Sequence, residues 1–168
     1  MAAINGATIA GAGRIIAIDT NPAKLQLATK LGATDLVNPT EADPVETVKG
    51  LTNGGVQHSF EVMGSKITAE QAFGMLAPGG TATIVGMIPF GTKIELHGAD
   101  FLGERRIQGS LMGSNHFRVD MPRLVDFYLS GKLHLDDWIS ANLKLAEIND
   151  GFANMKAGKT LRSVVEFT

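Results

Sequence analysis

The sequence contains no cysteine. Disulfide bonds, thiol nucleophiles and zinc sites built on thiolates are therefore excluded for these 168 residues. The four histidines are far apart and show no ligand spacing such as His-x3-His, so we expect surface or locally hydrogen-bonded histidines; ligands brought together by folding remain an alternative. They are His58, His97, His116 and His134.

Long apolar runs and charge of one sign are also missing. No stretch approaches the roughly 18 residues of a membrane-spanning helix. The net charge is -2, with acidic and basic residues interspersed, so no basic patch points to nucleic acid or anionic lipid. Residues 1–5 lack the basic and apolar regions of a signal peptide. We expect a soluble cytoplasmic protein without nucleic-acid or membrane partners.

Glycine is abundant, with 20 residues that fall mostly between apolar runs. Residues 14–19 and 81–85 are runs typical of strands buried on both faces. Residues 22–31 predict a helix with Asn21 as its N-cap and Gly32 beyond its end. Asp43 is the predicted cap of a second helix over residues 44–51, and residues 78–80 predict a turn. Because strands and helices alternate along most of the chain, we expect an α/β fold, a Rossmann-like doubly wound parallel sheet.

The carboxyl ends of three predicted strands fall at Asp19, residues 62–64 and residues 85–87. Parallel sheets bind ligands at such ends. No repeat, low-complexity run or linker divides the chain. We therefore expect one nucleotide-binding domain over residues 1–168, in which residues 131–168 can pack elsewhere in a longer parent.

Asp19 is the strongest local signal. An acidic residue that ends the second strand of a dinucleotide fold accepts hydrogen bonds from both adenosine ribose hydroxyls and repels a 2'-phosphate, which selects NAD over NADP. The alternative is that Asp19 caps the helix that begins near Pro22. The glycine-rich loop expected about 20 residues earlier would precede Met1, because residues 11–13 lead into a strand and fit a helix C-cap better. The predicted fold is thus N-terminally truncated, without its first strand and phosphate loop.

Several blocks in this order and spacing resemble the coenzyme domain of zinc-dependent medium-chain alcohol dehydrogenases. The group that includes glutathione- or mycothiol-dependent formaldehyde dehydrogenases is the most similar, and essentially the whole chain is covered. The blocks are residues 1–7, 11–19, 31–39, 60–64, 79–86, 109–114, 148–152 and 158–162.

The resemblance implies a set of NAD-binding residues, of which Arg162 would bond two pyrophosphate oxygens. Other interpretations stay open: Lys24 and Arg162 as solvated charges, and Val62, Val85 and Met112 as core. The set comprises Asp19, Asn21 and Lys24 at the adenosine, Val62 and Gly64 in the cleft, Val85, Gly86 and Met87 at the nicotinamide end, backbone from Ser110 to Met112 at the carboxamide, and Arg162 at the pyrophosphate.

In such enzymes a zinc held by Cys and His acts on the alcohol oxygen, and hydride passes between alcohol or aldehyde and NAD. This chain lacks those ligands, so we expect the coenzyme-binding part of such an enzyme, without turnover of its own. The resemblance also implies a homodimer through a strand at residues 106–112, and residues 131–168 packing on the catalytic domain of a full-length parent. Two alternatives are a non-catalytic nucleotide-binding or dimerisation module, and another nucleotide-fold enzyme such as a methyltransferase.

Overall fold

The computed structural model describes residues 1–167, so the last residue of the domain predicted over residues 1–168 lies outside the described part. The chain divides into two compact units. Residues 2–118 form the larger unit, and residues 119–167, with Met1, form the smaller one.

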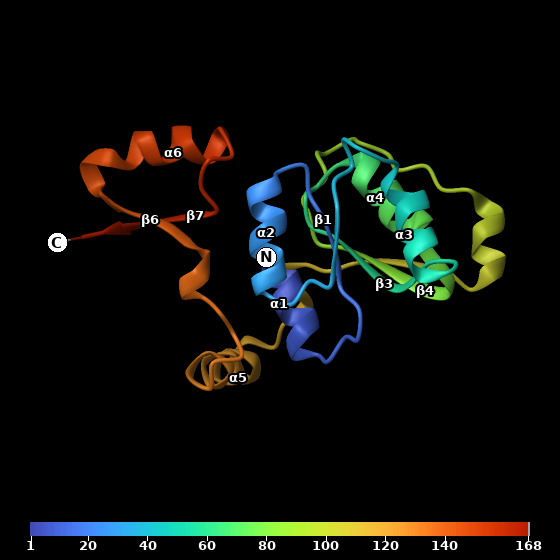
Figure 1. The fold of residues 1–168 in the computed structure, drawn as a ribbon, viewed down its shortest axis with the longest axis horizontal. Helices are drawn as coiled ribbons and strands as arrows, with labels where there is room; N and C mark the ends of the chain where they lie inside the picture. Colours follow the sequence, from blue (N-terminus) through green and yellow to red (C-terminus); the bar gives the residue numbers. More distant parts are fainter. Residues whose placement is uncertain (168) are drawn as a thin grey trace. The chain divides into compact units, whose positions relative to one another are not determined.

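The larger unit alternates short helices and strands (Figure 1). Its elements are α1 (Ala2–Ile9), β1 (Ile16–Ile18), α2 (Pro22–Lys30), β2 (Asp35–Val37), α3 (Pro44–Thr52), β3 (Val56–Glu61), α4 (Lys66–Gly74), β4 (Leu76–Ile84), the 3₁₀ helix η1 (Gly98–Gly103), β5 (Arg106–Gly109) and the 3₁₀ turn η2 (Met112–Ser114).

The smaller unit places a helix over a strand pair, with α6 covering β6 and β7 (Figure 1). Its elements are α5 (Phe117–Leu129), which starts at the junction, η3 (Asp136–Trp138), β6 (Ile139–Lys144), η4 (Leu145–Glu147), α6 (Ile148–Lys156) and β7 (Arg162–Glu166).

Every strand pair in the described residues is parallel. The larger unit contains a two-stranded sheet, β1-β2, and a three-stranded sheet in the order β3-β4-β5. The smaller unit pairs β6 with β7. No ladder joins β1 to β3 in the described residues, so each is an edge strand of its own sheet. The parallel α/β fold predicted from the alternation is confirmed.

Two helix starts follow the predicted capping chemistry. The Oδ1 atom of Asn21 accepts from the main-chain N–H of Ala23 at 2.9 Å. The Oδ1 atom of Asp43 accepts from the N–H of Glu46 at 2.9 Å. In both helices a proline follows the cap, where its missing N–H costs nothing because that donor has no partner within the helix. The sequence therefore sets the starts of α2 and α3 locally.

Packing of α4 against the three-stranded sheet forms the core of the larger unit. Phe73, Leu76 and Ala82 are almost fully buried, and Val56 and Ile107 pack against them. Figure 1 shows α3 and α4 side by side along β3 and β4. This packing holds the carboxyl ends of β3 and β4 next to each other.

Two element boundaries differ from the sequence-based expectations. The turn expected at residues 78–80 is an irregularity within β4, because Val56 pairs with Leu76 and His58 with Thr81. The strand expected over residues 106–112 ends at Gly109. Met112 and Ser114 have φ angles of 49° and 50°, and left-handed residues cannot continue a strand. These two boundaries are therefore determined by strand pairing and by left-handed backbone conformation, and not by the local apolar pattern.

Among residues 1–167, none of the helices has the length and apolar character that a bilayer crossing requires.

Candidate functional site

Asp19 lies immediately beyond the carboxyl end of β1. Its main-chain N–H donates to the carbonyl of Val37, the last residue of β2, at 3.3 Å. Its Oδ1 atom accepts from the N–H of Asn21 at 2.8 Å, and the residue is half-buried. The carboxylate therefore stands at the tip of the β1-β2 pair, where the sequence placed it.

The N-cap of α2 is Asn21, whose side chain accepts from Ala23. The Asp19 carboxylate accepts a hydrogen bond from the N–H of Asn21, which precedes the first residue of the helix. Asp19 is therefore not the N-cap of α2. Lys24, in the first turn of α2, is half-buried and forms no ion pair within the described residues. Asp19, Asn21 and Lys24 thus come from one strand-to-helix connection.

The sequence reasoning did not single out Glu61, which organises the adjacent strand ends. This carboxylate, at the end of β3, is only 3% exposed. Its Oε1 atom accepts from the N–H groups of Met63 at 2.8 Å and Gly64 at 2.7 Å, and from the hydroxyl of Thr68 at 2.7 Å. The signal was available, because Glu61 is an acidic residue at the end of a strand, three residues before Gly64, and Asp19 likewise follows the end of β1.

The main chain of Glu61 also connects β3 to β4. Its carbonyl accepts from the N–H groups of Val85 at 2.8 Å and Gly86 at 3.0 Å. One residue therefore holds the turn that opens α4 and the segment that leaves β4. Burying a carboxylate is costly unless it is hydrogen-bonded. The three donors to Oε1 satisfy that oxygen, whereas the buried Oε2 atom has no hydrogen-bond partner among the described residues.

Gly64 and Gly86 lie where two backbone segments touch. A Cβ atom on Gly86 would lie 2.2 Å from the nitrogen of Gly64, and one on Gly64 would lie 2.5 Å from the carbonyl oxygen of Met87. Gly64 also has a φ angle of 86°. Gly64, predicted to line the coenzyme cleft, and Gly86, predicted at the nicotinamide end, therefore both require glycine for the packing of the turn itself.

The apolar residues predicted for the site are exposed in this chain. Val62 is 56% exposed, Val85 43%, Met87 84% and Met112 81%. The alternative that Val62, Val85 and Met112 belong to the core therefore does not hold for the described residues. These side chains leave an apolar surface at the carboxyl ends of β3 and β4.

Ser110 lies against the end of β4. Its N–H donates to the carbonyl of Ile84 at 2.9 Å, and its hydroxyl lies 3.1 Å from that of Ser114. Met112 follows in the 3₁₀ turn η2. The backbone expected to meet a carboxamide therefore begins beside the strand end that carries Val85 and Gly86.

Arg162 belongs to the smaller unit, at the start of β7. Its side chain is stacked on Trp138, with the guanidinium carbon 5.4 Å from the ring centroid. The larger unit therefore carries all the other predicted site residues, and the smaller unit carries the predicted pyrophosphate ligand.

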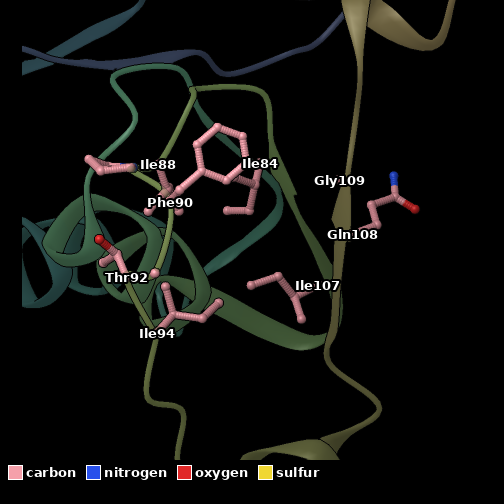
Figure 2. A pocket seen from close by; sticks show the side chains of 10 residues that line it. Ile84, Ile88, Phe90, Thr92, Ile94, Ile107, Gln108 and Gly109 are labelled. Atoms are coloured by element: carbon pink, nitrogen blue, oxygen red, sulfur yellow. The ribbon is translucent and has the colours of Figure 1, made fainter.

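An apolar pocket of about 500 Å³ lies beside the end of β4. Figure 2 shows Ile88, Phe90 and Ile94, from the segment after β4, grouped with Ile107 of β5. Gln108 points to the other side of β5 (Figure 2), and its amide lies 3.3 Å from the hydroxyl of Thr83. The lining of the pocket includes Ile84, the last residue of β4, and Gly109, the last residue of β5.

The side chains of the described residues do not fit a zinc ion. The sequence has no cysteine, and the described residues bring no three His, Asp or Glu side chains together. His97 lies 3.7 Å from Asp100, and His134 lies 3.6 Å from Asp137. These two histidines have local partners, as expected from their separation in the sequence.

A parallel sheet with covering helices, and a carboxylate at a strand tip, define the Rossmann-like class of nucleotide-binding domains. The family model described as zinc-binding dehydrogenase matches residues 1–130. The chain belongs to this zinc-binding dehydrogenase family.

Relatives and solved structures agree with the family. Alcohol dehydrogenase-like 1 of Arabidopsis thaliana is 40% identical over 98% of this chain and 44% of its own length. Benzyl alcohol dehydrogenase from Acinetobacter calcoaceticus is 32% identical with a TM-score of 0.95, over 99% of this chain and 46% of that one. A zinc-binding dehydrogenase from Sinorhizobium meliloti, bound to NADP, is 31% identical with a TM-score of 0.88, over 96% and 47%.

The chain therefore spans less than half the length of these relatives. It matches their Rossmann-like, coenzyme-binding part. This membership decides against the methyltransferase alternative.

Proposed function

We propose that this chain is the NAD-binding part of a zinc-type alcohol dehydrogenase that transfers hydride between an alcohol or aldehyde and NAD. Within the family, its sequence blocks favour the group of glutathione- or mycothiol-dependent formaldehyde dehydrogenases. The observation that carries the proposal is the Asp19 carboxylate at the tip of β1, beside the end of β2. A carboxylate there accepts from both ribose hydroxyls of a dinucleotide.

The same carboxylate favours NAD over NADP. A 2'-phosphate carries roughly two negative charges. It would lie close to the Asp19 carboxylate, which would repel it. Lys24 is the neighbouring cation that would face the adenosine together with Asn21. One lysine offers less compensation than the arginine that commonly accommodates a 2'-phosphate.

The remaining cofactor contacts follow the strand ends. Val62 and Gly64 would line the cleft, and Val85, Gly86 and Met87 would meet the nicotinamide end. Backbone groups from Ser110 to Met112 would hold the carboxamide, and Arg162 would bind the pyrophosphate. When bound, the nicotinamide supplies the hydride chemistry, while these residues bind it, orient it and exclude water.

The chain has no turnover by itself in this proposal. A metal that polarises the alcohol oxygen needs a set of ligands, and the described residues bring none together. We further infer a cytoplasmic protein and a single nucleotide-binding domain over residues 1–168, in which residues 131–168 pack on the catalytic domain of a full-length parent. Clear alcohol oxidation by the pure chain with NAD and zinc would contradict this.

The direct test is a titration of the chain with NADH and with NADPH, followed by nicotinamide fluorescence. We expect NADH to bind more tightly. Asp19→Asn removes the charge-assisted hydrogen bonds, so it should weaken NADH binding roughly tenfold or more and narrow the preference over NADPH. Asp43→Asn is the matched control, because Asp43 caps α3 and Asn caps equally well. Equal NADH affinity in native protein and Asp19→Asn would refute the proposal.

A second candidate is a non-catalytic nucleotide-binding or dimerisation module. The observation in its favour is β5, which pairs only with β4 and leaves its other edge open within the described residues. Open strand edges invite association. Self-association with no response to NADH would favour this candidate over the first.

A further inference from the structure

Trp138 and Arg162 are brought together by the register of β6 and β7. Trp138 immediately precedes β6, Arg162 begins β7, and Ile139 pairs with Arg162 in the parallel ladder. Trp138 is 8% exposed, whereas Arg162 is exposed. The indole is therefore a nearly buried platform, and the guanidinium lies on it at 5.4 Å.

The donors of Arg162 have no protein acceptor among residues 1–167. Arg14 shows the opposite arrangement, because its guanidinium donates to both carboxylate oxygens of Asp35 and to the carbonyl of Leu51. A stacked guanidinium uses its planar face, while its five N–H donors point outward in the plane. The edge of Arg162 is therefore available to an anion.

Local charge favours the same ligand. Lys156, Lys159 and Arg162 are the only charged residues between positions 151 and 165. The two carboxylates that precede Trp138 are engaged elsewhere, since Asp136 accepts from the hydroxyl of Tyr128 at 2.9 Å and Asp137 lies 3.6 Å from His134. Arg162 therefore lies in a segment of the chain whose charged residues are all basic.

We propose that Trp138 is a positioning residue that holds the Arg162 guanidinium ready to bind a diphosphate group. Stacking restricts the long arginine side chain before the ligand arrives, so less rotamer entropy is lost on binding. The inference rests on the proposed function, in which Arg162 binds the coenzyme pyrophosphate.

The single tryptophan of the chain provides the readout. Inorganic pyrophosphate is titrated into the native chain while the emission of Trp138 is followed, with sulfate at matched ionic strength as the control. We expect a saturable change in emission that is lost in Arg162→Gln. Pyrophosphate that leaves the emission unchanged in the native chain would overturn the inference.

Variants of Trp138 separate positioning from simple packing, with affinity measured by calorimetry. Trp138→Phe keeps an aromatic face and gives up no hydrogen bond, because the buried Nε1 atom has no acceptor in the described residues; it should bind almost as the native chain does. Trp138→Leu should bind roughly two- to fivefold more weakly. Phe117→Leu is the matched control, since Arg118 stacks on Phe117 at 5.9 Å and should not affect binding. Equal affinity of Trp138→Leu and Trp138→Phe would overturn the positioning role.

Failure of this inference is distinguishable from failure of the proposed function. If Asp19→Asn weakens NADH binding and Arg162→Gln weakens pyrophosphate binding, but Trp138→Leu binds pyrophosphate like the native chain, only the positioning inference fails. If the Trp138 variants behave as expected but NADH does not compete with pyrophosphate, the positioning of Arg162 stands and its coenzyme role fails.

Discussion

At the scale of single residues, three carboxylates near strand ends differ in their hydrogen-bond partners. The Asp19 carboxylate lies at a strand tip, and its Oδ1 atom accepts one main-chain hydrogen bond, from the N–H of Asn21. Glu61 is buried, and its Oε1 atom accepts hydrogen bonds from three donors in the turn that begins α4. Asp35 is paired with Arg14. Of the three, only Asp19 combines a strand tip with capacity to bind a ligand.

Gly86 makes a residue-scale prediction about this turn. Gly86→Ala places a methyl group within 3 Å of Gly64 main-chain atoms, so we expect a loss of about 1–3 kcal/mol in the free energy of unfolding. Urea denaturation measures it. Gly13→Ala is the control, because a Cβ atom there meets nothing within 4 Å. Equal stability of the two variants would contradict the close approach.

At the scale of elements, an ion pair joins three of them. Arg14, which precedes β1, donates to Asp35 of β2 at 2.6 and 2.8 Å and to the carbonyl of Leu51 in α3. Hydrogen bonds from Arg14 and from the Thr34 hydroxyl lower the pKa of Asp35 from 3.8 to about 2. This pairing holds the short β1-β2 ladder to the end of α3.

The direction of that shift predicts a pH dependence. Because the folded pKa of Asp35 is below its unfolded value, its stabilisation is complete above about pH 3.8 and is lost as the pH falls to about 2. Asp35→Asn should therefore be less stable than the native chain at pH 7, and the difference should shrink across this window. Urea unfolding at several pH values measures it.

Arg14→Gln is the matched variant for the same experiment. It removes the first cause of the shift, so it should flatten the pH dependence like Asp35→Asn, and the double variant should add little. A difference between native protein and Asp35→Asn that stays constant from pH 7 to pH 2 would show that the pair does not form.

At the scale of the whole molecule, exposed apolar surface indicates missing partners. Leu111 is 86% exposed, Met112 81% and Phe90 102%, and β5 is an open edge in the described residues. Isolated exposed apolar residues are ordinary, but Leu111 and Met112 are adjacent and follow shortly after the open edge strand, an arrangement typical of an interface. We therefore expect a homodimer through residues 106–112.

A charge in that surface tests the dimer. Leu111→Glu places a carboxylate in the interface, so it should shift the chain from dimer toward monomer in sedimentation or light-scattering measurements. Leu129→Glu is the control, since Leu129 is 76% exposed and lies outside the proposed interface. A native chain that remains monomeric at high concentration would rule the dimer out.

Much of the fold could be predicted from the sequence, because the residue patterns that indicate it are local. The caps at Asn21 and Asp43 act within three residues, and the alternation of apolar runs follows from burial of a parallel sheet on both faces. The identity of Asp19 as the acid after a strand needed only its neighbours in the chain. These features were therefore predicted correctly from sequence alone.

Long-range contacts decided the rest. The end of β5 at Gly109, the irregular pairing inside β4 and the unexpected β6 depend on partners distant in the chain. The burial of Glu61, the contact of Gly86 with Gly64 and the stacking of Arg162 on Trp138 depend on which strands become neighbours. Residue types and local spacing determine helices, caps and strand character, whereas sheet register determines which side chains meet, because pairing joins residues that no local pattern connects.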